Sequence, residues 1–452
     1  MKENRSFTSL LQLARNKKGK IDYKPLFQNY LNIAEKSQLK AKKGAAILAS
    51  LPGRRYPYVY PRDAASTSRV LSKLCVKEDF CSRAFPLLRD LATFILFCQR
   101  EDGYWGQRYN LNLREKSIYK QEDNVAHGIE VICNYALTAS KIGEPVVYKD
   151  RIVKALSKAV DFAMKNYYRQ EMDLFFSTTS IHESAIEKGY TIWVNFSYLS
   201  SFSLAVEFLE SEGEEKEVEK IQHILERFKN NIFKSFKLET GYIRRYTPTG
   251  DIDFRPDITL FSPFYFGFES PEDKIMLKTI DFISHHLWDP ILGGLQRYLP
   301  FTEDLNTHIH AGNGPWMVYT AILARYYYAT GHIEKGDVIL RLIDNYRSPE
   351  GYIPEHLSTR ERFEEFMRLE WNTGLDYAKE FSPDILLPGI PFNRIVEELN
   401  HMRKSYSRIS RWCSQNPEAK FIRFCCPLLW AHSEYTQALL EREKMEKRCG
   451  EK

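Results

Sequence analysis

Six short segments of the chain combine aromatic rings with carboxylates, guanidinium groups and amides. They are YPYVYPRDAAS at 56–66, YWGQRY with QEDN within 104–124, SIHESAIEKG at 180–189, QRYLPFTED through GNGPW at 296–316, GYIPEHLS at 351–358 and CCPLLWAHSEY at 425–435. Aromatic side chains stack on the flat apolar faces of a ligand, while charged groups fix its hydroxyls. The residue types therefore favour a site for a sugar-like ligand rich in hydroxyl groups.

The elements that must position these segments are predicted to be helices. Apolar residues recur at spacings of three and four. This pattern predicts helices at 27–41, 64–75, 82–99, 124–141, 150–168, 190–210, 214–235, 272–288, 315–331, 334–346, 392–410 and 428–446. Alternating strand patterns are scarce, and the best candidate, 241–254, is expected to form a hairpin or an excursion between helices.

Five of the six segments come at or just before the start of a predicted helix. Helix starts present free backbone N–H groups and the positive end of the helix dipole. If alternate helices run parallel in a ring, these starts share one face. We therefore expect the segments to converge on one pocket, although the sequence assigns no element after the segment at 351–358.

About twelve helices in one undivided chain fit either a solenoid or a closed ring of six helix pairs. No repeat of roughly 30 to 45 residues is visible, which argues against the common solenoids. We predict an all-α fold, an (α/α)6 toroid. Residues 1–39 form an N-terminal helical lead-in, and 40–452 form the toroid with a long excursion at about 356–425.

Composition and charge argue against several classes of partner. The chain has 64 basic and 59 acidic residues, a net charge of +5, and no basic motif of a nucleic-acid reader. The N-terminus has no apolar run typical of a signal peptide, and no window approaches the roughly 18 apolar residues of a membrane span. We therefore expect a cytoplasmic protein that contacts neither nucleic acid nor membrane, with its eight cysteines reduced.

Metal and cofactor motifs are not apparent. The pairs His308-x-His310 and His285-His286 have no third ligand at a standard spacing, and Cys425-Cys426 has no Cys-x-x-Cys companion. A glycine-rich phosphate loop is also missing from the sequence. We expect neither a metal nor a cofactor.

Several of the motifs carry a family resemblance. Pro61-Arg62-Asp63 after an aromatic run, Gln296-Arg297-Tyr298 with the GNGPW motif, Pro354-Glu355, and the LWAHSEY motif at 429–435 occur in an order that resembles the glucoamylase-type catalytic domain of glycoside hydrolase family 15. The resemblance covers about residues 40–445. It implies an (α/α)6 toroid and an inverting exo-acting α-glucosidase that releases β-glucose from α-glucans.

The resemblance leaves the substrate and the activity open. α-1,4 glucans are the leading substrates, while trehalose and α-1,6 glucans share the same fold and glutamate pair. Another sugar processed by a related mechanism is a further alternative. A non-catalytic glucan-binding or regulatory protein is the alternative from a different class, since the segment around Glu183 departs from the family pattern.

Inversion needs two carboxyl groups about 6.5–9.5 Å apart, one protonating the leaving oxygen and one activating water. The resemblance implies that Glu355 is the general base, with a solvent-facing loop glutamate as the alternative. Glu183 is the candidate general acid and Glu187 its rival, because His182 and Ser184 stand where the family has tryptophan and a second glutamate. A charged His182 beside Glu183 would favour the carboxylate, so His182 should be neutral or turned away.

The resemblance also implies residues that bind substrate. Arg62 and Asp63 match the pair that holds the terminal glucose, and the alternative is a buried Arg–Asp ion pair capping the helix that begins near Ala64. Arg297 matches an arginine that binds the sugars flanking the cleavage point. Asp123 is a weaker substrate-contact candidate, since aspartate is also a common N-cap.

Three tryptophans, Trp105, Trp316 and Trp430, are candidates for stacking on the substrate or for walls of the pocket, with core packing as the alternative for each. The stretch of about 75 residues between Glu355 and Trp430 is longer than the family pattern suggests. We therefore hypothesise that it builds a lid or a subsite wall that narrows the choice of substrate.

Overall fold

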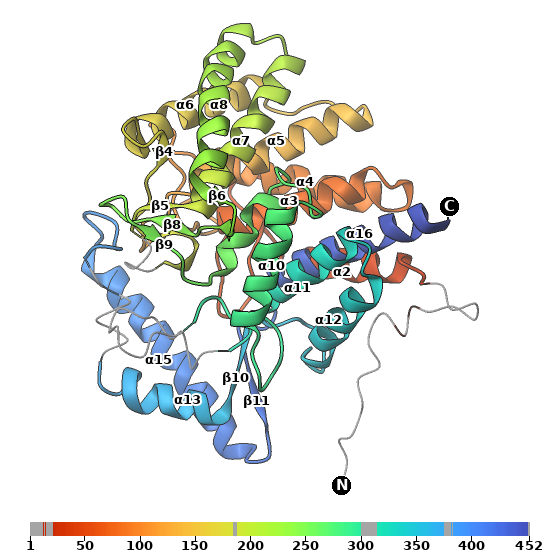
Figure 1. Ribbon diagram of the computed structural model, residues 1–452, viewed down its shortest axis with the longest axis vertical. Helices are drawn as coiled ribbons and strands as arrows, with labels where there is room; N and C mark the ends of the chain where they lie inside the picture. The colour runs from red at the N-terminus through yellow and green to blue at the C-terminus, as the bar shows by residue number, and fades with distance from the viewer. Residues whose placement is uncertain are drawn as a thin grey trace.

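The computed structural model describes residues 12, 14, 21–183, 188–299, 314–374, 381 and 383–450. Its helices form an (α/α)6 toroid, in which an inner ring of helices is surrounded by an outer ring (Figure 1). The fold predicted from the sequence is confirmed. Most buried apolar side chains of the toroid belong to one continuous core cluster.

The inner ring consists of α3 (Pro61–Cys75), α5 (Asn124–Ile142), α7 (Ile192–Ser211), the short pair η3 (Ile258–Phe261) and α9 (Ser262–Tyr265), α11 (Met317–Ala329) and α16 (Leu429–Gly450). Neighbouring members pack together, with Phe264 of α9 against Tyr326 of α11, and the packing of α16 on α3 closes the circle. An inner helix is covered on several sides, and α7 and α11 are accordingly apolar nearly all round, whereas α3 and α16 include many polar residues. In α11, every residue from Met317 to Tyr326 is buried.

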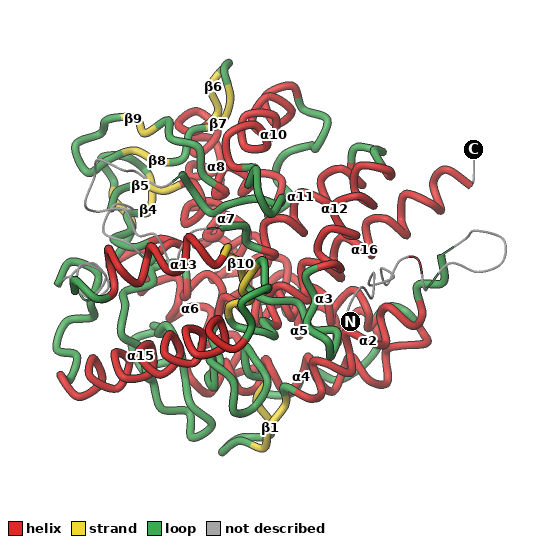
Figure 2. The backbone as a smooth tube through the Cα atoms, turned by 90° about the horizontal axis from the view of Figure 1, so that it is seen from below, coloured by secondary structure: helices red, strands yellow, loops and turns green. Residues whose placement is uncertain are grey.

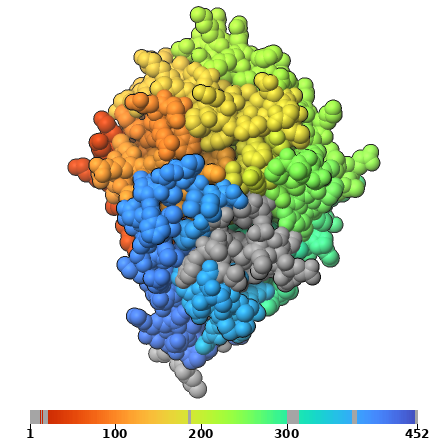
Figure 3. All heavy atoms as spheres, turned by 90° about the vertical axis from the view of Figure 1, so that its left-hand side faces the viewer, coloured from red at the N-terminus to blue at the C-terminus, as the bar shows by residue number. Residues whose placement is uncertain are grey.

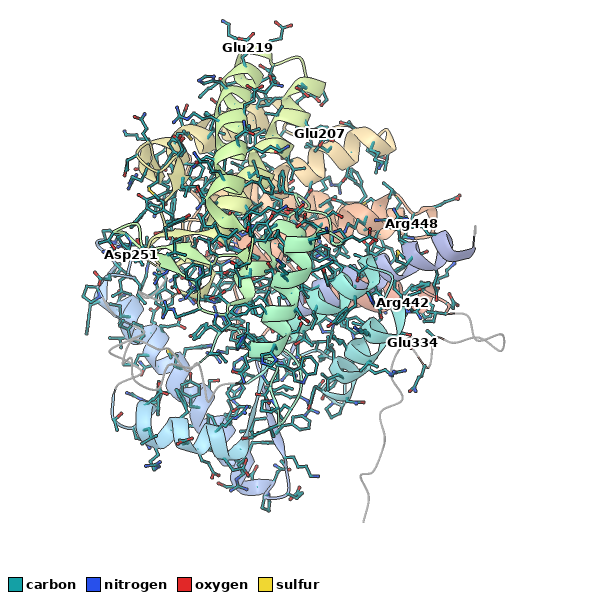
Figure 4. The ribbon with its side chains drawn as sticks, in the orientation of Figure 1. Glu207, Glu219, Asp251, Glu334, Arg442 and Arg448 are labelled. Atoms are coloured by element: carbon teal, nitrogen blue, oxygen red, sulfur yellow. The ribbon has the colours of Figure 1, made fainter. Side chains whose placement is uncertain are left out.

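The outer helices are α2 (Lys24–Lys36), α4 (Glu78–Cys98), α6 (Lys149–Asn166), α8 (Glu215–Phe236), α10 (Lys274–Leu287) and α12 (Ile333–Asn345). Each has one apolar face toward the inner ring. In α8, Val218 and Ile221 are buried, whereas Glu219 is exposed and points outward (Figure 4). Helix α2, which we assigned to the lead-in, packs on α4 and α16 and completes the outer ring.

Each of the twelve predicted helices is present, but one ring position differs from expectation. The fourth inner position holds η3 and α9, which together span only residues 258–265 and include Pro263. Eight residues are too short for helical periodicity to be recognised. The predicted helix at 392–410 is instead α15 (Phe392–Gln415), which lies outside the ring (Figure 1).

Among the described residues, α7 has the length and apolar composition that a membrane-crossing helix would need. No such window was expected from the sequence. In the structure, 78% of it is buried inside the protein, between α5 and α8. Its apolar character is therefore accounted for by its place in the inner ring.

The strands are short and lie in connections between helices. The predicted hairpin at 241–254 contains β8 (Arg245–Tyr246) and β9 (Ile252–Asp253), and β5 (Tyr190–Thr191) pairs with β8. Three other antiparallel pairs join β1 (Gln38–Lys40) to β2 (Ala45–Ile47), β3 (Tyr168–Arg169) to β4 (Leu174–Phe175), and β6 (Lys237–Leu238) to β7 (Gly241–Tyr242).

The excursion is a small helical unit inserted between two paired strands, β10 (His356–Thr359) and β11 (Phe421–Phe424). It contains α13 (Arg360–Phe366), the π-helix η5 (Met367–Trp371) and α15, which lie together on one side of the toroid (Figure 2). Its own apolar cluster is formed by Phe363, Phe366, Trp371, Met402, Tyr406, Cys413, Ile422 and Phe424.

The excursion docks on the loop that precedes α5. The amide of Lys120 donates to Ile385 O at 2.9 Å, and the amide of Leu387 donates to Ile118 O at 2.9 Å. The space-filling view shows the blue C-terminal segment lying against the orange segment of the chain (Figure 3). The insertion is therefore joined to the toroid at both its strands and its far end.

Candidate active site

A pocket lies at the end of the ring where α3, α11 and α16 begin. Its lining includes one or more residues from each of the six polar and aromatic segments, among them Tyr56, Gln121, Glu183, Arg297, Glu355 and Trp430. The prediction that these segments converge on one pocket is confirmed. Convergence arises because the helices of the inner ring present their N-terminal ends to the same face.

Glu355 is fixed by its backbone at the root of the excursion. Its amide lies 3.1 Å from Phe424 O and 3.0 Å from Cys425 O, and its carbonyl accepts from the Met317 amide at 2.9 Å. The side chain is 10% exposed. The Tyr56 hydroxyl lies 3.2 Å from each carboxylate oxygen. Glu355 is thus a pocket residue whose backbone and side chain are both fixed by hydrogen bonds. The alternative of a solvent-facing loop glutamate is wrong.

Glu183 follows a short 3-10 helix, η1 (Ser180–His182), and has a left-handed backbone with φ of 55°. Ser180 also has positive φ, 50°. Such conformations cost energy for residues other than glycine and are held by their surroundings. Gln121 Nε2 and Arg62 Nη1, the latter at 3.4 Å, both donate to Glu183 Oε1. Two donors therefore orient this carboxylate toward the pocket that it lines.

The His182 ring is turned toward Asp257. Arg297 Nε donates to His182 Nδ1 at 3.1 Å, and a guanidinium can only donate, so Nδ1 carries no proton. The proton on Nε2 is then donated to Asp257, whose oxygens lie at 2.8 and 2.9 Å. These contacts hold His182 as the neutral tautomer with its ring turned toward Asp257, which meets the expectation stated for His182.

Arg62 forms its ion pairs with Asp123 and Glu183. Its Nε and Nη2 donate to the two oxygens of Asp123, both at 3.0 Å. Asp123 is fully buried and also accepts from Trp193 Nε1 at 3.0 Å. Burial alone would raise the pKa of Asp123, but the charges and hydrogen bonds of Arg62 and His127 together outweigh burial, and the pKa falls well below its usual range.

The predicted substrate contact of Asp123 is therefore wrong, and so is the alternative that Arg62 and Asp63 form a capping ion pair. Asp123 does not line the pocket, because both of its oxygens are engaged by Arg62; it positions that arginine instead of contacting substrate. Asp123 is the N-cap residue of α5 but makes no side-chain capping bond. Within the described part of the chain, Arg62 and Asp63 form no ion pair with each other, so the proposed helix-capping pair is not formed.

Asp63, in the first turn of α3, lines the pocket. The pKa of Asp63 is raised to about 7, because burial and the charges of Glu355 and Glu183 outweigh the opposing charge of Arg62. A carboxyl group with this pKa changes charge near neutrality. Its ability to accept hydrogen bonds from a ligand then depends on pH in the same range.

Aromatic and cationic groups form the rest of the wall. The guanidinium of Arg297 lies 4.4 Å from the ring centroid of Trp316, and Arg297 Nη2 donates to Ile181 O at 2.7 Å. Trp430 lines the pocket and donates from Nε1 to Glu434 at 3.2 Å. Both tryptophans therefore hold positions suited to stacking or to forming the pocket wall.

Trp105 is a core residue, so its assignment to the pocket is wrong. It is fully buried, and its Nε1 donates to Ile95 O at 2.8 Å. Its ring packs directly against Gly128 of α5, where an added Cβ would lie 2.4 Å from the ring. The sequence cannot distinguish this tryptophan from the other two because all three occur in polar and aromatic segments.

The excursion contributes a wall of the pocket. Glu398 and Met402, both on α15, are lining residues. Arg108 Nη2 forms an ion pair with Glu398 Oε2 at 2.7 Å, and its Nη1 lies 3.3 Å from the Tyr60 hydroxyl. None of Glu398, Met402 and Arg108 was predicted from the sequence, although the unusual length of the excursion indicated a wall in this region.

Solved structures of glucoamylases have the same architecture as this chain. Glucoamylase from Saccharomycopsis fibuligera matches with a TM-score of 0.59 at 13% identity, covering 94% of this chain and 96% of that one. A bacterial glucoamylase complexed with acarbose matches with a TM-score of 0.58 at 16% identity, covering 93% of this chain and 55% of that one. The chain has the glucoamylase fold.

Two further solved structures are similar to this chain. A protein described as a wild-type glycosidase matches with a TM-score of 0.60 at 14% identity, covering 93% of this chain and 96% of that one. A metal-independent α-mannosidase of Streptococcus pneumoniae, in complex with α-1,6-mannobiose, matches with a TM-score of 0.56 at 11% identity, covering 74% and 87%. No family model and no curated protein sequence matches the chain.

Some sequence predictions lie outside the described residues, namely Glu187, His308, His310 and the first residues of the GNGPW motif. Within the ranges that the structure describes, no group of three or more His, Cys, Asp or Glu side chains could hold a metal ion. His285 and His286 lie in the last turn of α10, away from the pocket lining. The cysteines among these residues are free thiols.

Proposed function

We propose that this protein is a glycoside hydrolase of glucoamylase type, an inverting exo-acting α-glucosidase that releases β-glucose from the ends of α-glucans. The observation that carries the proposal is the presence of Glu183 and Glu355 in one pocket, each held by different partners. A pair of carboxyl groups is the chemical requirement of glycoside hydrolysis with either stereochemical course, and the inverting course is the one that the family resemblance implies.

Glu183 acts as the general acid in this proposal. It transfers its proton to the glycosidic oxygen as the bond from that oxygen to the anomeric carbon breaks. The carboxylate that remains is stabilised by the donors already placed at Oε1, Arg62 and Gln121. The neutral His182, held by Asp257, adds no charge that would remove the proton beforehand.

Glu355 acts as the general base. It accepts a proton from a water molecule while the water oxygen forms its bond to the anomeric carbon on the face opposite the leaving group. Tyr56 donates to the carboxylate and keeps its oxygens directed into the pocket. The product sugar then has the inverted, β configuration.

The remaining lining groups suit the binding of a terminal sugar. Asp63 accepts hydrogen bonds from hydroxyls, Arg297 and Arg62 donate, and Trp316 and Trp430 provide aromatic surface. The acarbose bound by the structurally similar bacterial glucoamylase supports an α-glucan substrate. Trehalose and α-1,6 glucosides fit the same chemistry and are included in the test.

The second candidate is a glucan-binding protein without catalysis. The contact of Arg62 with Glu183 favours it, because a guanidinium at 3.4 Å stabilises the carboxylate, which has no proton to give. The two candidates differ in whether sugar is released.

The test is glucose release from maltotriose, glycogen, isomaltose and trehalose, with the anomer followed by NMR. Glu355→Gln and Glu183→Gln are each expected to lower kcat by about 10²–10⁴-fold. Glu219→Gln, on the exposed face of α8, is the matched control and should retain full activity. Binding of glucan by folded protein with no sugar released would favour the binding protein, and release of α-glucose would contradict inversion.

A further inference from the structure

A second cavity, of about 340 Å³, lies between α15 and β11. Four arginines line it, Arg54, Arg55, Arg408 and Arg423, together with Trp412 and smaller side chains. We call it the arginine groove. Arg55 lines both this groove and the candidate active-site pocket, so the two cavities share one wall.

None of the four arginines forms an ion pair with a carboxylate in the described part of the chain. Three buried arginines elsewhere in the molecule are paired: Arg62 with Asp123, Arg347 with Asp344 and Arg442 with Asp337. Arg423 donates from Nε to Tyr346 O at 2.8 Å. Arg55 Nη1 is buried and has no hydrogen-bond partner within the same described ranges.

Two features of this arrangement cost free energy. A buried donor without a partner loses its hydration, and neighbouring cations repel one another. No acidic side chain lines the groove. Glu350 interacts electrostatically with Arg54 and Arg423, but it is not part of the lining and forms no ion pair with either. Glu355 likewise interacts electrostatically with Arg55 without lining the groove. The groove is therefore a concave surface on which positive charge predominates.

We propose that the arginine groove binds a phosphoryl group. Guanidinium groups match phosphate oxygens in pairs of parallel hydrogen bonds, and several of them can surround one dianion. Trp412, which is 37% exposed, and the half-buried Ile409 provide an apolar side next to the arginines. This apolar side can receive the organic part of a phosphate ester.

The groove lies behind the wall that positions Glu355. Its lining includes Ile422 and Arg423 of β11 and Cys425, and the carbonyls of Phe424 and Cys425 accept the Glu355 amide. A ligand in the groove thus contacts the strand that fixes this glutamate without entering the active-site pocket. Binding in the groove can be measured independently of any activity of the pocket.

The experiment measures binding to the full chain by calorimetry and by the shift in Tm. The probes are inorganic phosphate, glucose 6-phosphate and ADP, each compared with sodium chloride at matched ionic strength. The double variant Arg54→Ala/Arg408→Ala removes two exposed arginines of the groove. Arg403→Ala/Arg411→Ala removes the same charge from exposed positions of α15 outside the groove and is the control.

We expect at least one probe to raise the Tm of the unaltered chain and of the control, and to bind at least tenfold more weakly to the groove variant. Binding of inorganic phosphate identifies the free anion as sufficient. Binding of only the esters, weakened by Trp412→Ala, identifies a phosphate ester. The proposal is overturned if no probe acts beyond sodium chloride, or if the groove variant binds as tightly as the control.

Discussion

The hydroxyl of Tyr56 lies 3.2 Å from both carboxylate oxygens of Glu355, although the two residues are 299 positions apart in the chain. Burial raises the pKa of Tyr56 well above its usual value, and the charge of Glu355 adds to the shift. The phenol therefore stays protonated and donates. A hydrogen bond to the charged form of a carboxyl group lowers the pKa of that group, so Tyr56 helps to keep Glu355 ionised.

Replacement of Tyr56 by phenylalanine removes this donor. Hydrogen bonds to charged groups contribute about 1.5–3 kcal/mol, so we expect kcat/KM to fall about 10- to 100-fold. The acid limb of the pH profile should also move to higher pH, because Glu355 becomes easier to protonate. Tyr58→Phe alters a neighbouring ring outside the pocket lining and is the control. An unchanged acid limb in Tyr56→Phe would contradict the role of the donor.

Asp63 should make substrate binding depend on pH. Its pKa of about 7 means that it is an ionised acceptor only above neutrality. We expect KM to fall as pH rises through about 7. In Asp63→Asn, KM should be about 10- to 100-fold higher at pH 8 and should lose this pH dependence. Steady-state kinetics from pH 5 to 9 measure the effect, and a KM in the variant that still changes through pH 7 would assign the titration to another group.

Asp63 also makes the free energy of unfolding depend on pH. Its pKa rises from 3.8 to about 7 on folding, so between these values the folded state binds more protons than the unfolded state. Its contribution to the free energy of unfolding therefore falls as pH rises through this window. The unfolding free energy of Asp63→Asn relative to the unaltered chain should be higher at pH 8 than at pH 5. Denaturant unfolding at the two pH values provides the comparison.

Asp123→Asn tests the assignment of Asp123 as a positioning residue for Arg62. Removing one partner of a buried ion pair leaves the other charge uncompensated and costs about 3–5 kcal/mol. We expect a loss of stability of this order, together with a higher KM because Arg62 is no longer held. Asp150→Asn, at an exposed position of α6, should change neither quantity. A variant with a raised KM and unchanged stability would indicate direct substrate contact by Asp123.

Glu398→Gln tests the wall that α15 contributes. The change removes the ion pair with Arg108 while keeping the shape of the side chain. We expect the ratio of kcat/KM between glycogen and maltotriose to change by about threefold to tenfold, since a partly exposed ion pair contributes on the order of 1 kcal/mol. Glu397→Gln, the exposed neighbour outside this pocket, is the control. If the ratio of kcat/KM between glycogen and maltotriose were the same in both variants, α15 would not contribute a wall that affects the choice of substrate.

The helices and the pocket-forming segments could be predicted because their determinants are local. Spacing of apolar residues at three and four positions is a property of each helix by itself, and all twelve windows are helical. The position of polar segments at helix starts then followed from the sequence, and with it the convergence on one pocket that contains Glu183 and Glu355. The short inner element at 258–265 was missed because it has too few residues to show a period.

The roles of individual side chains depended on partners distant in the sequence. Asp123 binds Arg62 across 61 positions, and Tyr56 reaches Glu355 across 299. Trp105 and Trp316 occur in similar segments, yet Trp105 is buried in the core and Trp316 lines the pocket. The sequence by itself determined the ring of helices and the segments that meet at its end. Only the tertiary structure decided which groups contact one another, because burial and pairing depend on distances set by the closed ring.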